Sequence, residues 1–134
     1  MSKAIGIRAL ARRCGLSTHT LRYYEDAGLM LDVPRDHRGH RAYTDDHERW
    51  VRFLVRLRES GMGITTIREY ADLTRGAGDP DGSKRLAILR QHRDDVRERL
   101  SKLEAHLAIL DGKVAAGCGP LINGPQTTRE PRDA

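Results

Sequence analysis

Cysteine is scarce in this sequence, where Cys14 and Cys118 are the only two among 134 residues. Two cysteines cannot supply the disulfide framework that holds many small secreted domains together. Long apolar runs are also missing, and no run approaches the length of a membrane-spanning helix. Because the start of the chain also lacks the pattern of a signal peptide, we expect a cytoplasmic protein without a membrane partner.

Aromatic residues are few as well, with one Phe, one Trp and four Tyr, while 32% of the residues are charged. Such a composition is poor material for a large independent core, and it suits a small domain that pairs with a second copy. The sequence shows no grouping of a nucleophile, a base and an oxyanion donor. We therefore expect a protein that is not an enzyme and that has no cofactor.

The excess positive charge lies in the first part of the chain. Residues 1–58 contain twelve Lys or Arg and seven Asp or Glu, a net charge of +5, whereas residues 59–134 contain twelve of each. A basic surface attracts phosphate groups and supplies sequence-independent affinity for nucleic acid. The alternative is that the charge only aids solubility, but its concentration in one part of the chain favours a DNA-binding region.

Residues 7–27 have the pattern of two short helices joined by a tight turn. Apolar residues recur at helical spacing within 7–14 and predict one buried face. Gly15 suits the left-handed conformation that ends a helix, and Ser17 suits the N-cap of a second helix over 18–27. Three donors share one face of that second helix: His19, Arg22 and Tyr23. A helix-turn-helix with such a face is typical of proteins that enter the major groove of DNA.

Residues 29–43 contain a proline, a glycine and alternating polar residues. We interpret them as a small β-hairpin that forms the wing of a winged helix-turn-helix. Thr44 is expected to cap a third helix, and a fourth helix is expected over about 65–74. Residues 76–82, rich in Gly, Asp and Pro, are predicted to be a linker. The predicted fold is therefore mainly α, with a winged helix-turn-helix DNA-binding domain over 1–75.

Residues 83–115 have the heptad pattern of a coiled coil. Nine positions are separated alternately by three and four residues, and eight of them are apolar: Leu86, Leu89, Arg93, Val96, Leu100, Leu103, Leu107, Leu110 and Val114. This seam predicts a dimerisation helix, roughly 43 Å long from its first to its last position at ~1.5 Å per residue. Periodicity leaves the helix direction open, and Arg93 either sets the register or extends past the seam to solvent. Residues 116–134 are predicted to form a flexible tail.

Three motifs resemble those of the MerR family of bacterial transcription regulators. They are the stretch from Ile7 to Leu29, with L-R-Y-Y-E-D-A-G-L at its centre, then G-H-R-A-Y-T at 39–44 and R-L-R-E-S-G-M-G-I at 56–64. A helix-turn-helix alone is weak evidence, but three motifs in the family's order and spacing are strong evidence. The resemblance implies that the long helix forms an antiparallel coiled coil between two protomers.

The second helix carries the first group of expected DNA contacts. Arg22 and His19 are expected to contact base edges or the groove, because Arg is the commonest side chain that recognises guanine and His can donate to a base or a phosphate. Tyr23 is expected to donate its hydroxyl to a phosphate, and the family pattern implies that Tyr24 is the packed ring. Thr18, at the start of the helix, is expected either to donate to a phosphate or to cap the helix.

The predicted wing carries the second group of expected DNA contacts: Arg35, Arg38, His40, Arg41 and Tyr43. Arg41 and Tyr43 match the family's wing motif, and the resemblance implies that they bind the DNA backbone. Arg35 matches less securely, because wing length varies in the family. A hairpin whose charged side chains are simply solvated is the alternative.

The resemblance also implies how such a protein works. Family dimers bind pseudo-palindromic promoters whose spacer between the polymerase elements is too long, and an effector makes them bend and untwist that DNA. We therefore predict a homodimeric regulator with double-stranded promoter DNA and RNA polymerase as partners. The alternative is an architectural or excisionase-like DNA-binding protein. The long leucine seam favours the regulator, because it fixes two DNA-binding heads at one spacing.

The sequence does not identify the signal that controls such a regulator. Metal sensors of the family carry two or more cysteines after the long helix, whereas only Cys118 lies there in this chain. One thiolate cannot form a closed metal site, although a second copy, or His92 and His106, would add ligands. Cys118 is thus either a thiol or metal sensor or an incidental free thiol. A small-molecule effector is the other option.

Overall fold

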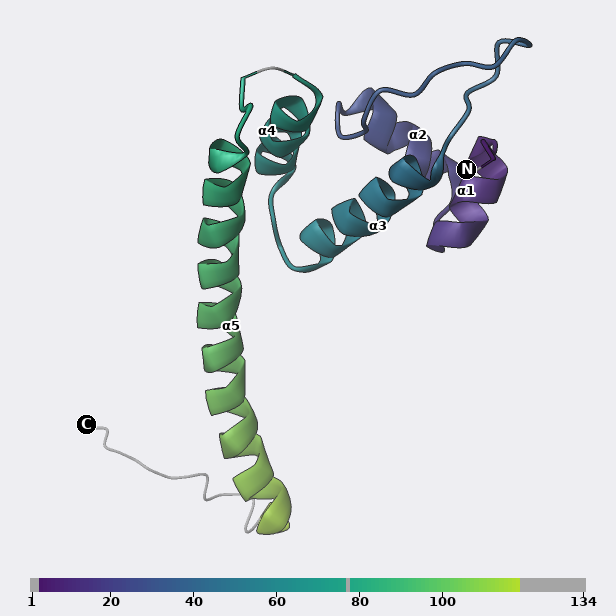
Figure 1. Cartoon of the computed structure of the whole chain (residues 1–134). Coiled ribbons are helices and arrows are strands. Elements are labelled where there is room, and N and C mark those ends of the chain that lie inside the picture. Colours follow the sequence, from purple (N-terminus) through teal and green to yellow (C-terminus); the bar gives the residue numbers. More distant parts are fainter. Residues whose placement is uncertain (1–2, 77, 119–134) are drawn as a thin grey trace. The chain divides into compact units, whose positions relative to one another are not determined.

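The computed structural model describes residues 3–76 and 78–118, and these contain five α-helices (Figure 1). They are α1 (Ile7–Cys14), α2 (Thr18–Asp26), α3 (Asp45–Glu59), α4 (Ile64–Arg75) and α5 (Ser83–Ala115). The prediction of a mainly α-helical chain is therefore confirmed. The chain divides into two compact units, Met1–Asp94 and Asp95–Ala134, so the division falls within α5. Most of the predicted tail, residues 119–134, lies outside the described residues.

The turn between α1 and α2 follows from local chemistry. Gly15 has a φ of +70°, a left-handed conformation that costs glycine little, and α1 ends there. The Ser17 hydroxyl then accepts the backbone N–H of Thr20 at 3.0 Å and caps α2. Leu10 and Leu21 enter the core from the two helices. This turn fixes the direction of α2, which carries four of the predicted DNA contacts.

The α3 helix supplies the centre of the core, with five buried side chains at helical spacing: His47, Trp50, Val51, Leu54 and Leu57. The Trp50 ring stacks on Tyr70 of α4, with the ring centroids 5.9 Å apart. Its indole N–H donates to the carbonyl of Leu29 at 2.8 Å. Because that partner follows α2, a single side chain joins α3, α4 and the segment after α2.

The predicted β-hairpin is not confirmed, because the described residues contain no strand. Residues 29–43, which we name the wing loop, form an extended connection between α2 and α3 in Figure 1. One isolated antiparallel bridge joins Arg35 to Arg41, and another joins Ile5 to Tyr43. Pro34, next to the first bridge, has no backbone N–H to extend the pairing.

The tip of the wing loop is held by the side chain of Asp36. Its Oδ1 accepts the backbone N–H groups of Arg38 at 2.8 Å and His40 at 3.0 Å. The backbone N–H of His40 is the main reason why the pKa of Asp36 lies below its usual value. The tip is therefore an ordered turn that fixes the backbone of Arg38 and His40, whose side chains are exposed.

The start of α5 is fixed by a buried carboxylate, Asp79. Its two oxygens accept the backbone N–H groups of Lys84 and Arg85 at 2.9 and 3.1 Å, and the Nε of Arg85 at 2.8 Å. Burial by itself would raise the pKa of Asp79, but these donors outweigh it and the pKa lies below its usual value. The described part of the predicted linker over 76–82 thus contains a helix cap.

The first turns of α5 belong to the same compact unit as the other helices. Ile88 and Leu89 pack against the core, and the Oγ of Ser60 lies 2.7 Å from the Nε2 of His92. These contacts explain why the division between the compact units falls within α5 and not in the linker. In the second unit, five seam side chains of α5 are exposed: Leu100, Leu103, Leu107, Leu110 and Val114.

Candidate nucleic-acid interface

A concave surface of about 1110 Å³ lies between α1, α2 and the wing loop. Five arginines from these three segments line it, together with one histidine and two carboxylates: Arg8, Arg12, Arg22, Arg35, Arg41, His40, Glu25 and Asp26. We name this surface the basic concavity. Arginines that converge on one hollow raise the local concentration of phosphate groups and present donors to base edges.

Four of the predicted DNA-contacting residues line the basic concavity: Arg22, Arg35, His40 and Arg41. Others lie elsewhere on the same unit. His19, Tyr23 and Arg38 are exposed, and Thr18 is half-buried at the start of α2. Their contacts with DNA stay predictions.

The two adjacent tyrosines of α2 differ as the family pattern implies. Tyr23 is 46% exposed, whereas Tyr24 is 7% exposed and belongs to the core. Burial is the main reason why the pKa of Tyr24 is raised. Tyr23 therefore has the accessibility that a phosphate contact requires.

Tyr43 does not lie on the surface where the sequence placed it. Its side chain is fully buried, and its hydroxyl donates to the Oε2 of Glu25 at 2.8 Å. Burial, followed by this hydrogen bond to a carboxylate, raises its pKa strongly. The expectation of a DNA contact at Tyr43 is corrected accordingly, because the ring instead packs the wing loop onto the core.

Glu25 joins the wing loop to α2. While its Oε2 accepts the Tyr43 hydroxyl, its Oε1 forms an ion pair with the Nε of Arg41 at 3.1 Å. The Glu25 side chain is mostly buried, so both contacts are shielded from water. The geometry indicates that Glu25 positions Arg41 along the edge of the basic concavity.

We predict that Glu25→Ala weakens DNA binding by about tenfold, because losing one hydrogen bond and one ion pair of roughly 1 kcal/mol each releases Arg41 and the wing loop. Charge alone predicts the opposite, since the substitution removes a negative charge from a surface that faces phosphates. The measurement is the equilibrium affinity for operator DNA by fluorescence anisotropy.

Asp26→Ala is the matched control, because Asp26 lines the same concavity and its carboxylate forms no hydrogen bond or ion pair with the other described residues. It should bind DNA as tightly as the unmodified chain, or more tightly. If Glu25→Ala also tightened binding, the positioning role of Glu25 would be wrong.

Arg8 and Arg12 of α1 are lining residues that the sequence analysis missed. They lie four residues apart and therefore share one face of α1, away from the buried Leu10 and Ala11. An exposed basic pair at this spacing was a visible signal. That this pair faces the wing loop depends on how the helices pack, and the spacing of the two residues alone does not reveal it.

Two arginines of α4 hold the end of α2. The Nε of Arg68 donates to the carbonyl of Ala27 at 2.8 Å. Arg75 donates to the carbonyls of Gly28, at 3.2 Å, and Met30. Carbonyls at a helix C-terminus favour cationic donors, so these contacts stabilise the end of the helix that carries Arg22.

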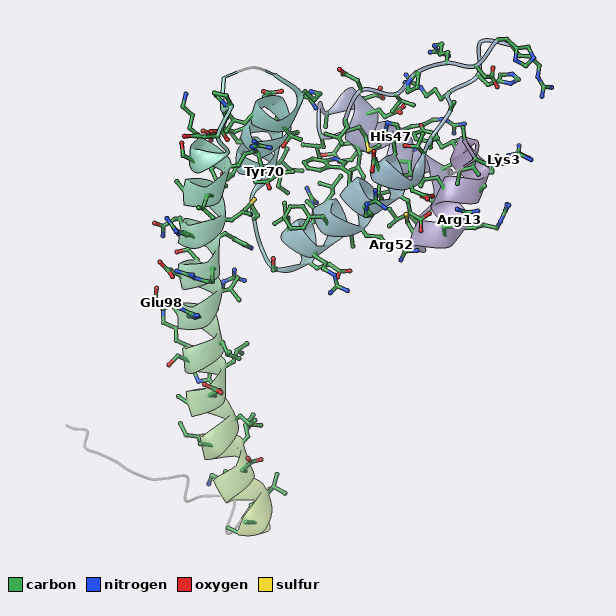
Figure 2. The ribbon with its side chains drawn as sticks, viewed as in Figure 1. Lys3, Arg13, His47, Arg52, Tyr70 and Glu98 are labelled. Carbon is green, nitrogen blue, oxygen red and sulfur yellow. The ribbon has the colours of Figure 1, made fainter. Side chains whose placement is uncertain are left out.

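Polar side chains also join α3 to α1 and to the wing loop, and Figure 2 labels three of them. Glu48 accepts from Arg13 of α1 at 3.3 Å and from Arg52 at 2.9 Å. The buried His47 accepts the backbone N–H of Thr44 at its Nδ1, so its Nε2 donates to the carbonyl of Asp32 at 2.7 Å. The helix-turn-helix and the wing loop are thus held on one rigid support.

The two cysteines differ in their surroundings. Cys14 is half-buried, and burial raises the pKa of its thiol, with Arg52 opposing the shift. Cys118 is exposed just after α5, with a φ of +69°.

Within residues 3–76 and 78–118, no three His, Cys, Asp or Glu side chains are grouped so that they could hold a metal ion. None of the helices there has both the length and the apolar character needed to cross a membrane.

Comparisons with known proteins agree with this geometry. Residues 6–74 match the model of the MerR HTH family regulatory proteins, and residues 48–113 match a MerR DNA-binding model. An HTH-type transcriptional regulator from Haemophilus influenzae is 32% identical over 105 residues, covering 78% of this chain and 77% of the relative. The transcriptional regulator AdhR from Bacillus subtilis is 31% identical, covering 72% of this chain and 65% of the relative.

A solved structure shares the fold and was determined with DNA. It is HiNmlR, a MerR family regulator lacking the sensor domain, bound to promoter DNA. The TM-score is 0.75 with 30% sequence identity, and the match covers 86% of this chain and 89% of HiNmlR.

Proposed function

Because this chain belongs to the MerR family of DNA-binding transcriptional regulators, we propose that it acts as a homodimer on a pseudo-palindromic promoter site. The observation that carries the proposal is the basic concavity, in which arginines of α1, α2 and the wing loop converge. One concavity binds one half-site. Two copies related by a two-fold axis bind two half-sites at a fixed spacing.

The exposed seam of α5 supports the homodimer. Within the second compact unit, the seam leucines and Val114 lie open to water. Each such side chain gains about 1.5–3 kcal/mol when it is fully buried, so a helix with this many is stabilised by a partner helix. A second copy offers a complementary seam of the same length.

Within each half-site we assign two kinds of contact. Arg22, on the exposed face of α2, contacts base edges in the major groove together with His19. Arg35, Arg38 and Arg41 of the wing loop, with Tyr23, bind flanking phosphates. Phosphate contacts fix the register of the protein on the duplex, and base contacts supply specificity.

We further propose that the dimer activates transcription by distorting a promoter spacer that is too long for RNA polymerase. The candidates for the signal that triggers the distortion are a small-molecule effector and a reaction at the exposed thiol of Cys118.

Transcription in vitro with purified RNA polymerase tests this proposal. On the natural operator, the protein should raise transcription when the effector is present and reduce it when the effector is absent. When the spacer is shortened base pair by base pair, the promoter should become active without the protein. If the protein were an architectural DNA-binding protein, adding it would instead leave the transcription level of each promoter unchanged, whatever its spacer length.

A further inference from the structure

Four charged residues follow one edge of the α5 seam. Arg90, Arg97, Glu104 and Asp111 recur every seven residues, each directly after a seam position. The first two are basic and the last two are acidic. Within the described part of the chain none of the four forms an ion pair. This edge therefore has opposite charges at its two ends and is complementary to itself when one copy is reversed.

Resting on the proposed homodimer and on the antiparallel direction that the family resemblance implies, we propose that these four residues set the register of the coiled coil. The two-fold axis then lies between Ser101 and Lys102. In this register Arg97 lies beside the partner's Glu104, and Arg90 lies beside the partner's Asp111. Symmetry doubles both pairs, so four ion pairs flank the seam on this edge.

The same register places seam side chains opposite one another. Leu100 lies against the partner's Leu103, and Val96 lies against the partner's Leu107. The polar seam residue Arg93 lies against the partner's Leu110 and pairs with its own neighbour Asp94, whose Oδ1 is 3.2 Å away. Arg93 therefore contacts no second arginine in the seam.

Other antiparallel registers bring like charges together. A shift by one heptad in one direction places Arg97 beside the partner's Arg97. The opposite shift places Glu104 beside the partner's Glu104. Like charges at such flanking positions are unfavourable, so both shifts lose attraction and add repulsion.

Parallel pairing is disfavoured for a separate reason. A parallel, in-register dimer would place Arg93 in one seam layer with the partner's Arg93. It would also bring Arg90 close to the partner's Arg85, although Glu104 would gain the partner's Arg99. Two guanidinium groups in one apolar layer lose hydration without gaining a counter-charge. The Arg93 layer is therefore the reason that a parallel dimer is unfavourable, in agreement with the antiparallel direction that the family resemblance implies.

Charge reversal tests the register directly. In the full chain, Arg97→Glu alone and Glu104→Arg alone each turn two attractive pairs into repulsive ones. Each should weaken the dimer by about tenfold, as expected from exposed pairs of up to ~1 kcal/mol. The double variant R97E/E104R should return the dimer affinity to within about threefold of the original, because both pairs reform with inverted sign. Sedimentation velocity at low salt measures these affinities.

Two further samples complete the test. An equimolar mixture of the two single variants should form heterodimers as tightly as the original chain, because every Arg97 and Glu104 position then meets the opposite charge. Glu98→Arg is the control, since Glu98 lies away from the seam and pairs with Lys102 of its own helix at 3.6 Å. It should leave the dimer affinity unchanged.

The outcomes separate this register from the proposed dimer itself. If the unmodified chain is monomeric at all concentrations, the homodimer is wrong and the register is wrong with it. If the unmodified chain dimerises but the double variant stays as weak as the single variants, the register is wrong and the homodimer stands. Circular dichroism of each variant confirms that α5 remains helical.

Discussion

Arg22→Ala should lower the affinity for the operator by about 10- to 100-fold, because a bidentate contact to a base edge contributes roughly 1–3 kcal/mol of discrimination. The affinity for random-sequence DNA should fall by about twofold at most, since only one positive charge is lost. Arg22 is exposed on α2 and lines the basic concavity, and it is not needed for the core. Competition binding with operator and random duplexes at one salt concentration measures both affinities.

Arg38→Ala is the comparison for this prediction, because it removes the same charge from the exposed tip of the wing loop. Because Arg38 is expected to contact a phosphate, its loss should lower the affinities for operator and random DNA equally. It should also reduce the number of counterions released on binding by about one, which the salt dependence of the affinity reports. If Arg22→Ala weakened both duplexes equally, Arg22 would be another phosphate contact, and base recognition would have to lie elsewhere on α2.

Leu103→Asp should abolish the dimer at micromolar concentration and remove specific operator binding. In the proposed register Leu103 lies against the partner's Leu100, and symmetry places two buried charges in the seam. Burying an unpaired carboxylate costs several kcal/mol, and the lost leucine contacts add about 1.5–3 kcal/mol for each chain. Sedimentation equilibrium and operator binding, measured over the same concentration range, should both change by at least about 100-fold.

Ile109→Asp is the control that distinguishes loss of a seam contact from loss of any exposed apolar side chain. Ile109 is 68% exposed and Leu103 is 63% exposed, so the two side chains are equally accessible in the single chain. Ile109 does not belong to the heptad seam, however, and its substitution should leave the dimer intact. Equal loss of the dimer in both variants would show that α5 pairs through a different face.

The helix boundaries were predictable because their causes are local. Gly15 and Ser17 end α1 and cap α2 through contacts within a few residues. The extent of α5 agrees with the heptad pattern, since the seam positions from Leu86 to Val114 span nearly all of Ser83–Ala115. Neighbouring residues along the chain thus carry enough information to predict most of the secondary structure.

The wing loop and its anchoring were not predictable in the same way. Alternating polar residues indicated a hairpin, but Pro34 and the Asp36 turn limit the pairing to one bridge. Tyr43 is buried, and its hydroxyl meets Glu25, a residue of α2 that lies 18 positions earlier in the sequence. A short sequence pattern predicts that Tyr43 lies in the wing, but it does not predict which carboxylate the Tyr43 hydroxyl contacts in the folded chain.

Arg68 and Arg75 show the same limit on α4. In the sequence they are two basic residues of an amphipathic helix, and nothing nearby marks them as partners of the α2 end. Their acceptors lie 41 to 47 residues away along the chain. Only the packed structure reveals that α4 supports the helix proposed to contact bases.

Footprinting of promoter DNA with the full chain tests the central claim most directly, when the number of chains on each duplex is measured alongside by native mass spectrometry. The account predicts one protected region with two-fold symmetry, two half-sites on one face of the duplex, and two chains bound to it. A series of weak protected sites without symmetry, or a single chain on each duplex, would contradict it.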